Sequence, residues 1–145
     1  MARPSVRSNR LASSGGYEAE TRGVAIRVRP SFLPDQSDPD ERRWTWAYHV
    51  DIENRSDETV QLISRHWVIT DGAGRVEEVK GPGVIGEQPT IRPGQIYSYA
   101  SGCPLATPSG MMAGSYQMVT DAGDRFEAAI PAFSLDTPNT RRTVN

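Results

Sequence analysis

The stretch Trp44-Thr45-Trp46-Ala47-Tyr48-His49-Val50-Asp51-Ile52 decides the fold class. Every second residue in it is large and apolar, whereas the residues between them are small or polar. A strand gathers such a set on one face, while a helix would scatter it around its axis. The pattern therefore predicts a strand with one face buried and the other, including His49, turned outward.

Outside this stretch the same two-residue period recurs in shorter runs, which glycine, proline and Asx residues separate. The runs predicted as strands are 24–29, 60–70, 75–80, 96–100, 116–120 and 125–130. The run 75–80 is polar and is expected at an edge of a sheet. Turns are expected at 54–58, 71–74, 91–94 and 121–124. No run shows the 3.6-residue period of an amphipathic helix, so about seven or eight short strands predict a sandwich or a barrel.

The run 60–70 contains a change of phase. Val60 and Leu62 share one phase of the alternation, whereas Trp67 and Ile69 share the other. A β-bulge within 64–66 would bring both pairs to the same face of the sheet. We therefore predict a bulge there and favour a core position for Trp67.

The 145 residues fit a single domain with flexible ends. Residues 1–16 are polar, serine-rich and basic, which predicts a disordered N-terminal arm. Residues 136–145 are predicted to form a flexible C-terminal tail. The folded domain is accordingly expected to span 17–135.

The composition limits which classes of partner and which cellular location we expect. The net charge is -2 and the charged residues alternate in small groups, so nucleic acid is not an expected partner. No apolar run reaches the roughly 18 residues that span a membrane, and no apolar segment follows the N-terminal arginines as in a signal peptide. The single cysteine, Cys103, cannot form an internal disulfide and suits a reducing compartment. We predict a cytoplasmic protein that does not associate with membranes.

Several motifs are specific when they occur together and in this order. They include Arg65-His66-Trp67, Gly86-Glu87-Gln88-Pro89 and Ser101-Gly102-Cys103-Pro104-Leu105, within the segments 46–54, 60–71, 81–89, 93–94, 97–105, 110–118 and 130–133. Over 17–135 the chain resembles the ApaG family, which is also called DUF525.

The resemblance implies an immunoglobulin/fibronectin type III-like β-sandwich of about seven or eight antiparallel strands. The family also occurs as a domain appended to F-box proteins and to a eukaryotic DNA-polymerase-interacting protein, which implies a non-catalytic module that binds an unknown protein partner. Bacterial relatives, under the name CorD, are linked to cobalt resistance and magnesium efflux. The resemblance implies no reaction, and a fold alone does not supply one.

The segment Gly81-Pro82-Gly83-Val84-Ile85-Gly86 fits the pattern G-x-G-x-x-G. A dinucleotide-binding fold needs a helix after this pattern, and Pro89 leaves no room for one. One remaining interpretation is a nest in which the amides of Gly81, Gly83 and Gly86 bind a phosphate or pyrophosphate, with Arg65 or Lys80 beside it. The other, which we favour, is that the glycines only shape a loop by tolerating positive φ.

A protein partner would use other residues. His66, Glu87, Gln88, Tyr97 and Tyr99 are the candidate partner-binding residues. Tyr97 and Tyr99 suit either an outer binding face or packing across a strand pair. We also hypothesise an ion pair between Glu87 and Arg65. Pairing of exposed edge strands would give a homodimer.

Metal binding and catalysis have weak sequence support. His49 and His66 are the only histidines and do not form a ligand pair, while the acidic residues of 35–41 miss the spacing of a calcium-binding loop. Cys103 has no evident partner base, and no G-x-S-x-G elbow is present. We predict no metal site, no cofactor and no catalytic residues, so the metal phenotype would be indirect.

Overall fold

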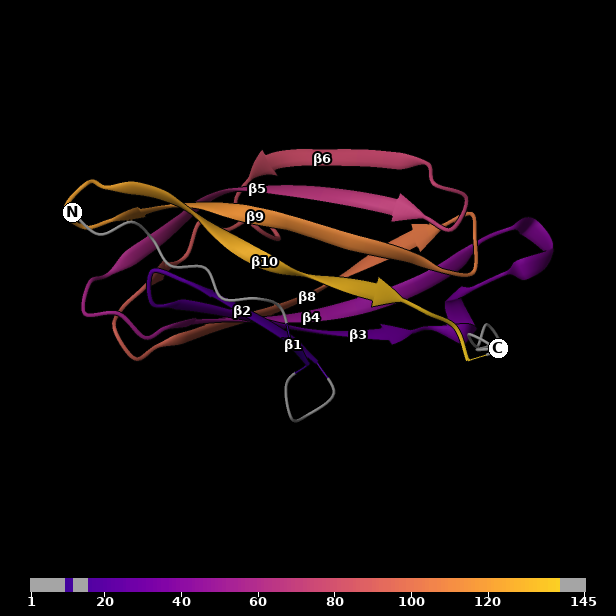
Figure 1. Ribbon diagram of the computed structural model, residues 1–145, viewed down its shortest axis with the longest axis horizontal. Helices are drawn as coiled ribbons and strands as arrows, with labels where there is room; N and C mark the ends of the chain where they lie inside the picture. The colour runs from indigo at the N-terminus through magenta and orange to yellow at the C-terminus, as the bar shows by residue number, and fades with distance from the viewer. Residues whose placement is uncertain (1–9, 12–15, 139–145) are drawn as a thin grey trace.

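Alternating apolar and polar residues fold the chain into two antiparallel sheets that pack face to face (Figure 1). The computed structural model describes residues 10–11 and 16–138. One sheet has the order β1-β2-β3-β4-β8, and the other has the order β10-β9-β5-β6, with β7 beside β5. The strands are β1 Arg10–Leu11, β2 Tyr17–Thr21, β3 Val24–Phe32, β4 Trp44–Asn54, β5 Val60–Asp71, β6 Val76–Pro82, β7 Thr90–Ile91, β8 Ile96–Leu105, β9 Gly110–Thr120 and β10 Arg125–Leu135. Two 3-10 turns, η1 Pro34–Gln36 and η2 Pro39–Glu41, connect β3 to β4.

The predicted all-β sandwich is confirmed. β1 and β7 have two residues each, and the strands of five residues or more agree with the expected seven or eight. The hairpin turns expected at 71–74 and 121–124 join β5 to β6 and β9 to β10. The polar run 75–80 lies in β6, which is an edge strand as predicted.

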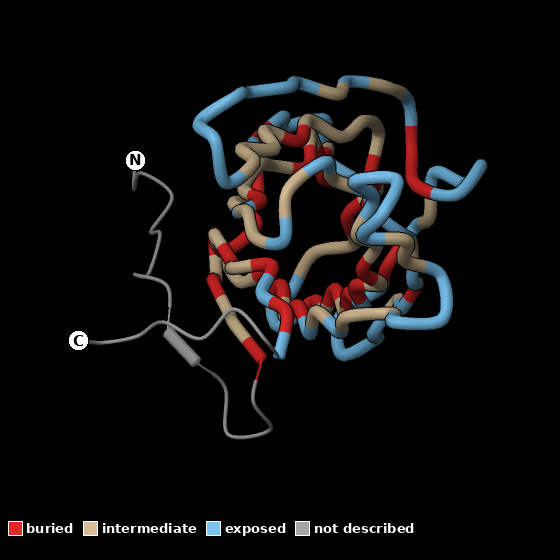
Figure 2. The backbone as a smooth tube through the Cα atoms, turned by 90° about the vertical axis from the view of Figure 1, so that its right-hand side faces the viewer, coloured by how far each residue is buried: buried red, intermediate tan, exposed pale blue. Residues whose placement is uncertain are grey.

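The alternating stretch 44–52 lies in β4, which runs between β3 and β8. Its side chains Trp46, Tyr48, Val50 and Ile52 are buried, whereas His49 is exposed. Seen end-on in Figure 2, buried segments line the space between the two layers. The core therefore lies between the sheets, and β4 supplies the centre of one wall.

The predicted bulge in β5 is confirmed slightly before its expected place. The register with β9 shifts between Leu62 and Ser64, so Ile63 is the extra residue. After this shift Trp67 faces the core together with Leu62, and Trp67 is 3% exposed. The bulge also sets the direction of Arg65, because residues two apart on a strand share a face.

β8 and β9 are both longer than the sequence predicts. The glycines of β9 interrupt the apolar pattern, yet they allow two backbones to approach closely. A Cβ at Gly114 would lie 2.0 Å from the carbonyl oxygen of His66, and one at Gly110 would lie 2.5 Å from Cδ1 of Leu105. Glycine here marks the close approach of a neighbouring chain segment and does not end the strand.

The ends of the chain lie partly outside the described residues. Of the predicted arm, 1–16, the structure describes Arg10–Leu11, which pair with β2, and Gly16. Of the predicted tail, 136–145, it describes 136–138, and the carbonyl of Asp136 accepts a 2.9 Å hydrogen bond from Nε1 of Trp46. None of the helices in the described part of the chain is long and apolar enough to cross a membrane.

Candidate functional site

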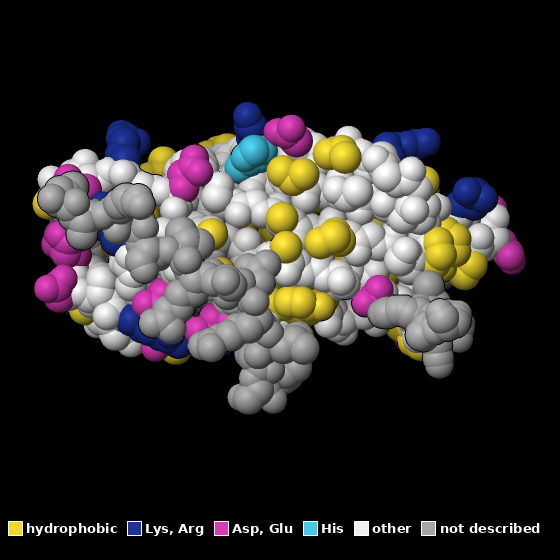
Figure 3. Space-filling model, viewed as in Figure 1, with side chains coloured by type: hydrophobic (Ala, Val, Ile, Leu, Met, Phe, Trp, Pro, Cys, Tyr) yellow, Lys and Arg dark blue, Asp and Glu magenta, His cyan; other side chains and the backbone are white. Residues whose placement is uncertain are grey.

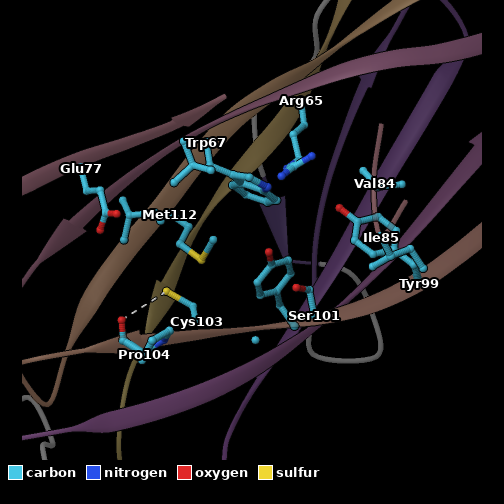
Figure 4. Close-up of a pocket in the computed structure, with 14 residues that line it drawn as sticks. Arg65, Trp67, Glu77, Val84, Ile85, Tyr99, Ser101, Cys103, Pro104 and Met112 are labelled. Atoms are coloured by element: carbon cyan, nitrogen blue, oxygen red, sulfur yellow. Dashed lines mark hydrogen bonds between the residues drawn. The ribbon is translucent and has the colours of Figure 1, made fainter. Parts of the chain in front are cut away.

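The sandwich has an open side between the edge strands β8 and β6, each of which is the last strand of its sheet. A cavity of about 420 Å³, which we call the open-side pocket, lies between them. Figure 4 shows its side chains reaching in from opposite walls, with Arg65 and Trp67 on one and Ser101 and Cys103 on the other. Aromatic and aliphatic groups make up most of the remaining lining.

Arg65 places a guanidinium on the inner side of β5, on the same face as Trp67. Its Nη1 donates hydrogen bonds to the carbonyl oxygens of Pro82 at 3.0 Å and Gly83 at 2.9 Å. The residue opposite Arg65 in β6 is Gly81, where a Cβ would lie 3.1 Å from Nη1. The absence of a side chain at this glycine leaves the space in which the guanidinium lies.

Arg65 has no acidic partner among the described residues. The ion pairs there involve the cationic side chains of Arg22, Arg27, Arg29, Arg55 and His66. An arginine stays protonated throughout the physiological range, and its planar head offers five N–H donors. Neutral carbonyls therefore hold a full positive charge at the pocket without compensating it.

Tyrosine hydroxyls lie close to this cation. Tyr48, Tyr99 and Tyr116 are buried, and the hydroxyls of Tyr99 and Tyr116 are hydrogen-bonded to each other. Burial raises the pKa of all three phenols, and the positive charge of Arg65 partly opposes that rise. These groups are therefore neutral hydrogen-bond donors at physiological pH and do not serve as bases.

Cys103 lies at the other end of the pocket, near Glu77. Burial, assisted by the negative charge of Glu77, raises the pKa of its thiol to about 11. A thiol that stays protonated is a poor nucleophile and a poor metal ligand. Across the residues that the structure describes, no group of three or more His, Cys, Asp or Glu side chains could hold a metal ion.

The glycine motif does not form the amide nest that one interpretation required. Gly81 belongs to β6, and the amide of Gly83 donates a 2.9 Å hydrogen bond to the carbonyl of Ile63. Gly83 has φ +61, and a Cβ there would lie 2.1 Å from the carbonyl oxygen of Glu87. The Gly83 amide is therefore not free for an anion, and positive φ is found at Gly83 and Gly86 but not at Gly81.

The second half of the motif is a tight hairpin turn. Val84 and Glu87 exchange backbone hydrogen bonds of 2.8 and 2.9 Å. Ile85 and Gly86 lie between them with φ values of 42 and 81. Positive φ at both central residues is the geometry of a type I′ turn. Gly86 therefore reverses the chain at the tip of the turn.

Five of the predicted site residues instead line a hollow of about 530 Å³ beside the β5–β6 ladder, which we call the outer hollow. They are Arg65, His66, Lys80, Gly81 and Gln88. His66 and Lys80 are opposite each other in the register, and Nε2 of His66 lies 2.9 Å from Oε1 of Glu78. Figure 3 shows that charged side chains on this face gather toward its rims. The lining of the hollow combines apolar groups with charges of both signs, including Lys80 and Glu127, and Arg65 contributes both to it and to the open-side pocket.

The hypothesised ion pair between Glu87 and Arg65 is wrong. Oε1 of Glu87 accepts a 3.0 Å hydrogen bond from the hydroxyl of Tyr97, because the tight turn places Glu87 beside β8. Gln88 donates from Nε2 to the carbonyl of Ile63 at 2.8 Å. These side chains fasten the loop after β6 to the two sheets.

The structure also decides between the alternatives for the two tyrosines of β8. Tyr99 is 7% exposed and is opposite Val50 of β4, so packing across the strand pair is supported and an outer binding face is not. Tyr97 is half-buried on the same inner face. Both rings therefore belong to the open side of the sandwich.

Sequence reasoning missed Tyr48 and Ser101 as parts of the site. The two-residue alternation gave part of the signal, because each of these residues lies an even number of positions from buried residues of its own strand. It could not show that Ser101 faces Arg65 across the gap, because β5 and β8 belong to different sheets. That proximity depends on how the two sheets pack.

Comparisons with known proteins agree with this architecture. The ApaG domain family (DUF525) matches residues 34–120. Protein ApaG of Mesorhizobium japonicum is 61% identical over 129 residues, covering 89% of this chain and 99% of the relative. Protein ApaG of Rhodospirillum centenum is 59% identical over the same shares.

A solved structure is also similar. The crystal structure of an ApaA protein from Bordetella pertussis superposes with a TM-score of 0.77 at 42% identity, covering 94% of this chain and 100% of that one. The match of the family over most of the domain, together with relatives of this identity and coverage, establishes the assignment. The chain belongs to the ApaG family.

Proposed function

We propose that the protein is a non-catalytic, cytoplasmic binding domain that holds a protein partner on the open side of its sandwich. The observation that carries this proposal is the uncompensated guanidinium of Arg65 at the open-side pocket. Arg65 is only partly buried, and the described chain gives its guanidinium neutral carbonyls but no acidic pairing group. An incoming anionic group would supply it.

The chemistry of the pocket supports binding over catalysis. The thiol of Cys103 has a pKa near 11, and burial raises the pKa of Tyr48 and of Tyr99. A general base requires a group whose pKa lies near the working pH, and a nucleophile requires a lowered pKa, an adjacent base or a metal ion. Hydrogen-bond donors and apolar walls are what a recognition site requires. The effect of family members on cobalt resistance and magnesium efflux would then be indirect and would depend on the protein partner.

A comparison of captured proteins tests this proposal. Ser101→Trp would fill the open-side pocket, whereas Ala129→Trp would add the same ring to the outer face of β10 as a matched control. We expect the wild type and Ala129→Trp to retain the same proteins from a cell lysate, and Ser101→Trp to lose them. If Ser101→Trp folds with an unchanged circular dichroism spectrum and retains every protein, the open side is not the binding surface.

Binding of a small phosphate-containing ligand is the second candidate function. The cationic side chains that line the outer hollow favour this function. Arg65 and Lys80 both line this hollow. Titration with pyrophosphate or diadenosine tetraphosphate should then raise the melting temperature in a saturable way, because a ligand at 100 times its Kd adds about 2.7 kcal/mol of stability. Lys80→Met should weaken the shift, and a flat response to both compounds would eliminate this candidate.

A further inference from the structure

The edge strand β8 differs from the other edge strand of the open side. Among the described strands β8 pairs only with β4, so no described strand pairs with its second row of backbone N–H and C=O groups. Its ten residues, Ile96–Leu105, contain no charged side chain. β6 carries Glu77, Glu78 and Lys80, which is the usual protection of an edge against pairing with another chain. Apart from Pro104 near its end, β8 has no such protection.

The inner face of β8 lies beside a pocket that has charge of opposite sign at its two ends. The positive charge of Arg65 acts on Tyr99, and the negative charge of Glu77 acts on Cys103. These two β8 residues are four positions apart, which corresponds to about 13 Å along a strand. A strand added to β8 would direct alternate side chains into this pocket.

The hydroxyls near Arg65 can add a donor for an acidic group. Only one proton lies between the oxygens of Tyr99 and Tyr116, so the other hydroxyl proton is left for a further acceptor. A carboxylate at Arg65 could accept from the guanidinium and from this hydroxyl pair, and charge-assisted bonds of this kind are strong.

We propose that β8 accepts an extended segment of the partner as an added strand, and that an acidic side chain of this segment binds Arg65. The inference rests on the proposed function and specifies its ligand. Three inward residues of the segment would be opposite Tyr99, Ser101 and Cys103. The geometry assigns them an acidic, an apolar and a basic or apolar side chain at two-residue spacing. Backbone hydrogen bonds to β8 would supply affinity, and the pocket would supply specificity.

A selection from a phage-displayed library of random dodecapeptides, fused through their C-termini, tests this inference on the full-length chain. Selected peptides would be synthesised with both ends capped, so that no terminal carboxylate contributes. We expect an acidic residue with an apolar residue two positions away. Arg65→Met should weaken binding at least about 30-fold, because one partner of an enclosed charge pair is removed. Arg125→Met removes an exposed cation of β10 that lines neither the open-side pocket nor the outer hollow, and it should leave binding unchanged.

Backbone pairing has a separate readout that a pocket-only ligand would not produce. Methylation of the peptide amides one at a time should abolish binding at alternate positions, where the N–H faces β8. Amide protons of β8 should exchange more slowly with solvent when the peptide is bound.

The outcomes separate this inference from the proposed function. Peptides that bind Arg65→Met as well as the wild type, or that tolerate methylation at every amide, overturn the added strand and its acidic residue. If such peptides still fail to bind Ser101→Trp, the proposed function survives. Peptides that bind Ser101→Trp normally contradict both. A selection that enriches no peptide overturns the inference, and the lysate comparison then decides the proposed function alone.

Discussion

The two long sides of the sandwich have the same alternating strands but are completed in different ways. On the closed side, β10 packs against β2 and β3, and the amide of Ala129 reaches across the sheets to Oγ1 of Thr21 at 3.1 Å. Rings of Tyr17 and Phe133 fill that side at a centroid distance of 6.1 Å. On the open side, the corresponding space is a pocket that contains the cation of Arg65. The closed side is thus filled by packed side chains, whereas the open side keeps a pocket whose polar groups are available for recognition.

The largest expected effect comes from the closed side. Phe133 is 1% exposed and its ring contacts those of Tyr48 and Trp67, each at a centroid distance of 6.0 Å. Phe133→Ala should lower the free energy of unfolding by about 3–5 kcal/mol, because the lost ring leaves a cavity. Urea denaturation would measure it, with Ser101→Ala as the open-side control. A loss below about 1 kcal/mol would contradict the contrast between the two sides.

The glycine motif gives an effect of intermediate size. Gly83→Ala should lower the free energy of unfolding by more than about 2 kcal/mol, since the new Cβ would collide with the Glu87 carbonyl and φ is positive. Gly86 has φ +81, but nothing lies within 4 Å of its missing Cβ. Gly86→Ala should therefore cost only about 1–2 kcal/mol. Equal losses in thermal denaturation would show that the collision is relieved at no cost.

Arg65 is expected to matter little for stability. Arg65→Met removes two hydrogen bonds to carbonyls but also a cation held near the core, and these contributions oppose each other. The free energy of unfolding should change by less than about 1 kcal/mol in either direction. A loss above about 2 kcal/mol in urea denaturation would make Arg65 a structural residue and would remove the basis of the open-side site.

The smallest effect belongs to the outer face of the first sheet. A hydrogen bond from Arg27 is the main influence that holds the pKa of Glu53 below its ordinary value of 4.5. The carboxylate therefore contributes stability above that pH, and the contribution disappears as the pH falls through the lower pKa of the folded state. Glu53→Gln should be slightly less stable than wild type at pH 7, and the difference should shrink as the pH falls from 4.5 through the lower pKa of the folded state. Melting temperatures across that range would reveal a constant difference if the ion pair had no role.

Local patterns predicted the sheets better than the site. The alternation in β4, the bulge in β5 and the edge position of β6 follow from the order of apolar and polar residues along each strand. The inward direction of Arg65 also follows once the bulge is placed at Ile63. The sequence cannot show that Gly81 is opposite Arg65, or that the Gly83 amide is already bonded to Ile63. Those are pairings between strands, so the sequence suggested an amide nest of which the Gly83 amide is already used by the fold.

The neutral thiol of Cys103 has a practical consequence for how the protein ages and how its motions can be followed. With a pKa near 11, only about one thiol in ten thousand is ionised at neutral pH. Oxidation by peroxide and cross-linking between copies should therefore be slow, also in the absence of reductant. The same inertness makes Cys103 a sensor, because reaction with a thiol reagent would report each transient opening between β8 and β6. An occupant of that gap would slow the labelling whatever its chemical class.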